Sequence, residues 1–89
     1  MIHKVKCINP YFEDVLAGRK SFEIRKNDRN YKVGDLMILW EYNPEREMFM
    51  NRHCLVEIVY VFEGVKYGKY GLHKGYVILG IKNFEAPKS

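Results

Sequence analysis

The segment from Gly18 to Arg25 holds the charged residues whose types and spacing are best suited to chemistry, and it fits the pattern G-x-K-x-x-E-x-R. A glycine can end a helix in the left-handed conformation, which places Arg19 and Lys20 in the turn that follows. Glu23 and Arg25 then share one face of the next strand, about 6.6 Å apart along it. One carboxylate and three cations are therefore predicted to meet in a small volume.

Such a group suits an anionic or heterocyclic ligand. Cations bind phosphate or carbonyl oxygens, and a carboxylate can accept hydrogen bonds from the amino or imino edge of a base. We expect a basic cleft for a nucleic-acid component, with Lys20, Glu23 and Arg25 at its centre. Further residues of the predicted site are Ser21 beside the lysine, the phosphate-binding candidates Arg19, Lys4 and Lys6, and the stacking candidates Tyr67 and Tyr70, with Tyr76 as a third tyrosine.

A purely structural interpretation of the motif stays open. Glu23 and Arg25 can form an ion pair on a solvated strand face, with Lys20 as a surface residue. Exposed pairs of this kind contribute only about 0–1 kcal/mol. Judged on spacing alone, this interpretation is favoured over a binding site.

The elements that must position these residues are mostly strands. Alternation over residues 2–7 predicts a strand with His3, Val5 and Cys7 on one face. A two-turn helix follows, with Asn9 as N-cap, Pro10 in its first position, Gly18 at its end, and Tyr11, Phe12, Val15 and Leu16 on one apolar face. Period-two alternation then predicts a half-buried strand over residues 21–26, with Phe22 and Ile24 on the face opposite Glu23.

Three later strands complete the prediction. An apolar run from Leu36 to Trp40 continues to Tyr42, and residues 43–47 are typical of a hairpin loop. A long strand follows in which Cys54, Val56, Ile58, Tyr60 and Phe62 share one face. Residues 63–75 are glycine-rich and are predicted as a loop, and residues 76–81 form a last strand. We expect one domain over residues 1–83 and a polar tail over residues 84–89.

Composition limits the function classes. A chain of 89 residues with 47% hydrophobic residues has material for one core, and no run reaches the ~18 apolar residues of a membrane helix. We expect a cytoplasmic protein that is monomeric and does not associate with membranes. Cys7 and Cys54 form no metal or disulfide pattern, and the histidines lack metal spacing, so no metal site and no cofactor are predicted. Asp35 after Gly34 is expected as a turn former, and Trp40 as part of the core or of a cleft wall.

Charge is unevenly spread along the chain. Residues 1–32 carry eight Lys/Arg against four Asp/Glu, residues 33–65 carry two against six, and residues 66–89 carry five against one. If the fold brings both ends together, one face becomes positive, as expected for a phosphate-bearing ligand. Dispersed solubilising lysines are the competing interpretation.

The motif resembles the signature of the ASCH superfamily of PUA-like domains, and of a small bacterial and phage branch of it with unknown function. The resemblance runs from about residue 3 to residue 81. The segments that carry it, besides the motif, are His3-Lys4-Val5-Lys6, Asn27-Asp28-Arg29, Val33-Gly34-Asp35, Glu41-Tyr42 and Gly75-Tyr76-Val77-Ile78-Leu79. It implies a mixed α+β, mainly β fold: a small PUA-like barrel of five to six strands with one N-terminal helix.

Three functions follow as hypotheses. The first is a non-catalytic module for RNA or a modified nucleotide, with DNA as a possible competitor. The second is a small ASCH-type hydrolase, an amidohydrolase on acylated cytidine or a ribonuclease, in which Lys20 and Glu23 act as acid and base. The amidohydrolases that this chain resembles place a threonine at the position of Glu23, which leaves the nucleophile open. The third is a protein-interaction domain that uses the acidic middle segment.

Overall fold

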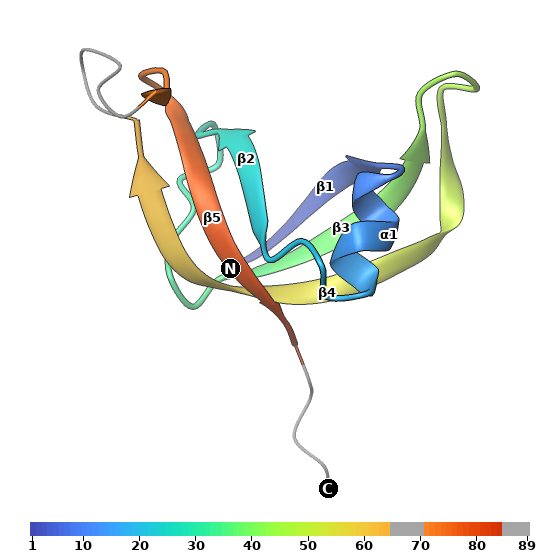
Figure 1. The fold of residues 1–89 in the computed structure, drawn as a ribbon, viewed down its shortest axis with the longest axis horizontal. Coiled ribbons are helices and arrows are strands. Elements are labelled where there is room, and N and C mark those ends of the chain that lie inside the picture. The colour runs from blue at the N-terminus through green and yellow to red at the C-terminus, as the bar shows by residue number, and fades with distance from the viewer. Residues whose placement is uncertain (65–70, 85–89) are drawn as a thin grey trace, which may run out of the picture.

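The computed structural model describes residues 1–64 and 71–84. It is mostly β, with one short helix and a five-stranded sheet that curls into a half-barrel (Figure 1). The elements are β1 (Ile2–Ile8), α1 (Tyr11–Leu16), β2 (Phe22–Lys26), β3 (Leu36–Asn43), β4 (Met48–Glu63) and β5 (Tyr76–Asn83). Within these residues no helix has the length and apolar character needed to cross a bilayer.

The sheet has the order β1-β3-β4-β5-β2. β1 runs parallel to β3, and the other pairings are antiparallel. β4 is the longest strand and curves along the base of the half-barrel, with β5 and β2 on one arm and β3 and β1 on the other (Figure 1). β1 and β2 are the two edge strands, so the segments on either side of α1 in the sequence lie at opposite edges of the sheet.

The core lies on the concave side of the sheet. β1 alternates as predicted, with His3, Val5 and Cys7 buried and the residues between them exposed. Alternate residues of the other strands complete the core, above all Met37, Leu39, Val56, Ile58, Val77 and Leu79. The period-two pattern of the sequence therefore grouped the residues of β1 correctly, and the structure shows that the face with His3, Val5 and Cys7 is the buried one.

The helix occupies the region that the sequence predicts, but its ends and its buried face differ in detail. Pro10 is the N-cap, and Asn9 acts from one position earlier, where its Oδ1 accepts a hydrogen bond of 3.2 Å from the Glu13 amide. Gly18 has φ of 80°, the left-handed conformation expected after the helix. Phe12 and Val15 are buried, whereas Tyr11 and Leu16, predicted on the same face, are exposed because six residues bury only a narrow stripe.

The prediction that β4 keeps one apolar face throughout is wrong. Pairing with β5 shifts register between Ile58 and Tyr60, as a β-bulge does, and this turns the side chains that follow. Ile58 is fully buried, but Tyr60 is 63% exposed and Val61 packs against the core instead. The pattern of apolar residues alone does not reveal the extra residue.

The side chains of β2 alternate as predicted, but the charged residue points inward and the apolar residues point outward. Phe22 and Ile24 are 44% and 55% exposed, while Glu23 between them is only 4% exposed. The strand thus turns its charged side toward the interior of the half-barrel. Since a buried carboxylate is costly without partners, the residues around Glu23 must satisfy it.

Candidate functional site

Glu23 is the centre of the predicted cluster, and two cations meet its carboxylate. Lys20 Nζ lies 2.5 Å from Oε1 and also donates to the Phe22 carbonyl at 2.7 Å. Arg25 donates to Oε2 through Nε at 3.1 Å and its terminal NH2 lies 2.9 Å from the same oxygen. Lys20, Glu23 and Arg25 therefore converge on a small volume, as their spacing predicts, with the carboxylate buried and both cations mostly covered; Arg19, the third predicted cation, does not join them.

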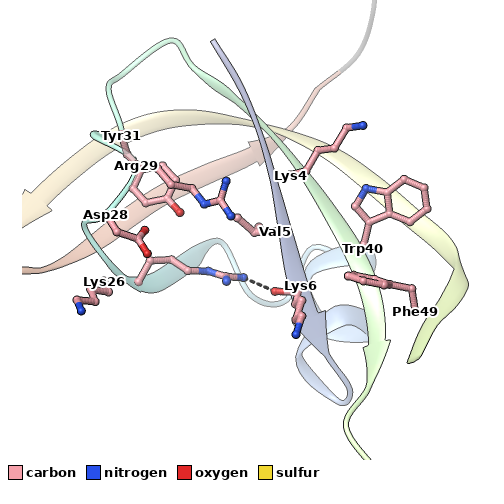
Figure 2. Close-up of a pocket in the computed structure, with 10 residues that line it drawn as sticks. Lys4, Val5, Lys6, Lys26, Asp28, Arg29, Tyr31, Trp40 and Phe49 are labelled. Carbon is pink, nitrogen blue, oxygen red and sulfur yellow. Dashed lines mark hydrogen bonds between the residues drawn. The ribbon is translucent and has the colours of Figure 1, made fainter. Parts of the chain in front are cut away.

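Arg25 also connects the two edges of the sheet. Its terminal NH2 group donates to the Lys6 carbonyl at 2.6 Å, from β2 to β1 (Figure 2). One guanidinium thus bridges the buried Glu23 and the backbone of β1. The solvated ion pair considered as an alternative does not describe this arrangement, because Glu23 is inside the fold.

A pocket of about 640 Å³ opens beside Arg25. This volume lies within the range of ~300–1,000 Å³ typical of small-molecule sites. Five cations and one carboxylate line it together with apolar and aromatic side chains; its residues are Lys4, Val5, Lys6, Arg25, Lys26, Asp28, Arg29, Tyr31, Trp40 and Phe49. We call this the basic pocket.

The basic pocket extends across β1. Arg29 and Tyr31, from the connection between β2 and β3, lie to one side of the strand, and Lys4, Trp40 and Phe49 lie to the other (Figure 2). All five of its cations come from residues 1–32, the first basic segment of the chain. The fold thus concentrates that segment's positive charge at one opening, next to aromatic rings from β3 and β4.

A family model described as "Domain of unknown function (DUF3850)" matches residues 2–81, nearly the whole chain. The chain belongs to this family. An uncharacterized 12.9 kDa protein in the GpA 3' region of Escherichia phage P2 is also similar, with 54% identity over 41 residues. Those residues are 46% of this chain and 38% of the phage protein, so the match covers well under half the length of that relative.

The structure distributes the predicted site residues of this DUF3850 domain over two hollows. Lys4, Lys6 and Arg25 line the basic pocket. Lys20 and Ser21 instead line a smaller hollow of about 220 Å³ with Gly18 and the end of β5. Glu23 lies between them and contacts both Lys20 and Arg25, so one carboxylate connects the two hollows.

The remaining predicted residues lie elsewhere. Arg19 is exposed and donates to Asp14 Oδ1 at 3.1 Å, at the end of α1. Tyr67 and Tyr70, the predicted stacking residues, are outside the described residues. Tyr76 begins β5 and is exposed, but does not line either hollow. The nearby rings that do line the basic pocket belong to Tyr31, Trp40 and Phe49.

Six residues of the basic pocket were not predicted as site residues: Val5, Lys26, Asp28, Arg29, Tyr31 and Phe49. Arg29 lies in a segment rich in turn-forming residues. Because simple turns and ligand-binding loops have similar compositions, the sequence does not indicate that Arg29 lines a pocket. Phe49 follows a hairpin turn, and its place at the pocket cannot be inferred from the short apolar stretch around it. Trp40 forms a wall of the pocket, in agreement with its predicted place in the core or a cleft wall.

Two polar pairs, each with one buried member, support the walls of the half-barrel. His3 Nε2 lies 2.8 Å from Asp35 Oδ2, and this contact holds the pKa of Asp35 below its usual value. Asp35 also accepts from the Lys32 amide at 3.2 Å, which agrees with its prediction as a turn former. Because the His3 ring also lies 4.7 Å from the Tyr31 ring, this pair helps to hold the connection that carries Tyr31.

The second pair joins β3 and β4 to α1. Arg52 donates to both oxygens of the buried Glu41 at 2.9 Å, which lowers the pKa of Glu41, and a contact from Asn9 adds to the effect. Arg52 also pairs with Glu13 on α1. No group of three or more potential metal-binding side chains occurs within residues 1–64 and 71–84.

Proposed function

We propose that this DUF3850 domain binds RNA or a nucleotide in the basic pocket. The observation that carries the proposal is the lining of that pocket, where five cations and three aromatic rings accompany one carboxylate, Asp28. Cations supply phosphate binding, and aromatic rings supply stacking surfaces for bases, the combination found in proteins that bind single-stranded nucleic acids.

Arg29 is the most informative residue for this function. Arg25 is already engaged by Glu23 and the Lys6 carbonyl, so it presents a fixed donor at the pocket wall. Arg29 lines the same pocket, and its guanidinium can bind a phosphate through two parallel hydrogen bonds. We therefore assign phosphate binding to Arg29 with Lys4, Lys6 and Lys26.

Binding of a fluorescein-labelled single-stranded RNA, followed by anisotropy, tests the proposal. If three or four phosphates are neutralised, affinity falls about 20- to 50-fold between 50 and 200 mM salt, from a slope of about −0.7 per phosphate on logarithmic axes. Arg29→Gln should weaken binding and flatten that slope. Lys82→Gln removes the same charge outside the basic pocket and should leave binding unchanged. Salt-independent binding, or an equal loss in both variants, contradicts the proposal.

A hydrolase is the second candidate, and the Lys20–Glu23 contact beside the smaller hollow favours it. A lysine 2.5 Å from a buried carboxylate is an arrangement that can transfer protons. Against it, Glu23 is already shared with Arg25, and Ser21 is exposed. Incubation with acylated cytidine and with single-stranded RNA tests this function, and product that disappears in Lys20→Ala supports it. If neither acylated cytidine nor RNA gives a product, the hydrolase function is contradicted.

We also propose membership of the ASCH superfamily, with a PUA-like fold. The G-x-K-x-x-E-x-R motif and the curled five-stranded sheet with one helix before β2 support this assignment. Backbone pairing between β1 and β2 in a crystal structure, which would close the barrel, would strengthen it. A sheet that stays open between these two edge strands would weigh against it.

A further inference from the structure

The face of β1, β3 and β4 that points away from the core carries a row of aromatic rings beside a lysine. Strand register places Lys6, Trp40 and His53 directly opposite one another across the three strands. The next row along the sheet places Tyr42 opposite Phe49. Side chains in register on neighbouring strands lie about 5 Å apart, so these five form one continuous surface. We call it the aromatic platform.

The rings of the platform support one another without covering Trp40 on all sides. The His53 ring lies 4.7 Å from the Trp40 ring at an angle of 33°, close to a stacked arrangement. Phe49 meets Trp40 edge-on at 6.5 Å and meets Tyr42 at 5.1 Å. Trp40 and Phe49 line the basic pocket, whereas His53 is not among its lining residues, so part of the indole surface faces the pocket.

Positive charge lies directly beside these rings. Lys6 Nζ is 4.3 Å from the centroid of the Tyr42 ring, and Lys4, two residues earlier on the same face of β1, lines the basic pocket. The buried carboxylate of β3, Glu41, is on the other side of the sheet and is engaged by Arg52. The platform therefore offers stacking surfaces and cations together, which matches the alternation of bases and phosphates in a nucleic-acid strand.

We propose that the occupant of the basic pocket is an unpaired strand of several nucleotides that crosses β1, with one base stacked on Trp40 in the corner made with Phe49. The inference rests on the proposed function and specifies its ligand. Lys4 and Lys6 bind phosphates on the platform side of β1, and Arg29 binds a phosphate on the other side. The extension of the pocket to both sides of β1 requires a ligand longer than one nucleotide to use all of these contacts.

This geometry discriminates against two related ligands. In a duplex the bases are already paired, and all but those at the two ends are stacked on both faces, so no internal base face is free to stack on an indole. A free mononucleotide has one phosphate, which cannot engage cations on both sides of β1 at once. An unpaired oligonucleotide is the class that satisfies the whole surface.

Trp40 is the only tryptophan of the chain, so its fluorescence reports directly on stacking. We would titrate the protein with single-stranded hexa-adenylate, with adenosine monophosphate, and with a six-base-pair RNA duplex at low salt. Anisotropy of labelled hexa-adenylate would be measured in parallel. The expected result is quenching of Trp40 emission by hexa-adenylate at concentrations that match the anisotropy curve. Adenosine monophosphate and the duplex should quench only at concentrations at least tenfold higher.

Two variants on β4 provide a matched pair. Phe49→Leu removes one ring of the corner and should weaken hexa-adenylate binding about 5- to 150-fold, the range for loss of one base–aromatic stack. Tyr60→Leu removes a similarly exposed ring from the same strand outside the basic pocket, and should leave binding unchanged. Thermal unfolding of both variants verifies that they are folded at the assay temperature.

The outcomes separate this inference from the proposed function. If labelled hexa-adenylate binds with the salt dependence given above but leaves Trp40 emission unchanged, the platform is not the stacking site and this inference is wrong, while the proposed function stands. Equal affinity for adenosine monophosphate and hexa-adenylate overturns it as well. If no RNA binds at low salt, the proposed function fails and this inference fails with it.

Discussion

Replacing Glu23 by glutamine is the most direct perturbation of the interior of the half-barrel. The amide has nearly the same shape as the carboxylate but no charge, so it removes the partner of two cations without creating a cavity. Its NH2 group is a donor and faces either Lys20 or Arg25, which are donors themselves. The variant therefore leaves at least one cation without an acceptor on that side.

The magnitude follows from the contacts and their burial. Hydrogen bonds to charged groups contribute about 1.5–3 kcal/mol each, and Glu23 accepts from both Lys20 and Arg25. The two cations retain 17% and 22% of their side-chain exposure, so water compensates for part of the loss. Arg25 also keeps its bond to the Lys6 carbonyl. We expect a loss of about 2–4 kcal/mol in the free energy of unfolding, a large fraction of the ~5–15 kcal/mol typical of a domain.

Urea unfolding at pH 7, monitored by Trp40 fluorescence, measures this loss. A domain of this size should also show a fall in Tm of about 8–32 °C, at roughly 4–8 °C per kcal/mol. Lys20→Met and the double variant of Lys20→Met with Glu23→Gln complete a double-mutant cycle. The cycle isolates the Lys20–Glu23 coupling from the effect of each substitution alone.

A stability of Glu23→Gln within 0.5 kcal/mol of the wild type would refute this reasoning. It would mean that the buried carboxylate contributes no more than a surface ion pair, which is the interpretation that spacing alone favoured. Additive effects of the two single substitutions would refute the coupling, even if each variant is destabilised.

Three further predictions concern other parts of the fold. Because His3 lowers the pKa of Asp35, their contact stabilises the fold above the ordinary aspartate pKa of about 4, and this stabilisation is lost as the pH falls further. The wild type should therefore lose more unfolding free energy between pH 5 and pH 2.5 than Asp35→Asn, as measured by urea unfolding. Burial raises the pKa of the Cys7 thiol to about 11, with Glu23 adding to the rise, so this thiol should react with a thiol reagent at pH 8 only after unfolding, and reaction in the native state at the rate of a free thiol would contradict the burial. Gly18→Ala should lower the unfolding free energy by about 1–2 kcal/mol, because φ is 80° at this position. The loss would come from the backbone alone, since no atom lies within 4 Å of the added methyl group. An unchanged free energy in urea unfolding would show that the turn relaxes.

Local sequence patterns predicted strands and helix ends well where the pattern depends only on neighbouring residues. Alternation identified which residues of β1 share a face, and Gly18 identified the end of the helix region. The prediction for β4 was wrong where Tyr60 was concerned, since a register shift against β5 depends on the partner strand and leaves no mark in the local pattern. The exposure of Phe22 and Ile24 was likewise undetermined, because alternation gives two faces but does not say which one is inside.

The sequence by itself determined that Glu23 and Arg25 share a face of one strand and that Lys20 lies in the turn before it, because these relations involve neighbours within six residues and follow from backbone geometry. Tertiary structure alone decided that this face is buried, that Lys20 and Arg25 line different hollows, and that Arg29 and Phe49 line the same pocket. Twenty residues separate Arg29 from Phe49 along the chain, and the curl of the sheet across β1, β3 and β4 brings them together. The period of the side chains determines which of them point to the same face of a strand. Which distant segments come close together depends instead on how the strands pair.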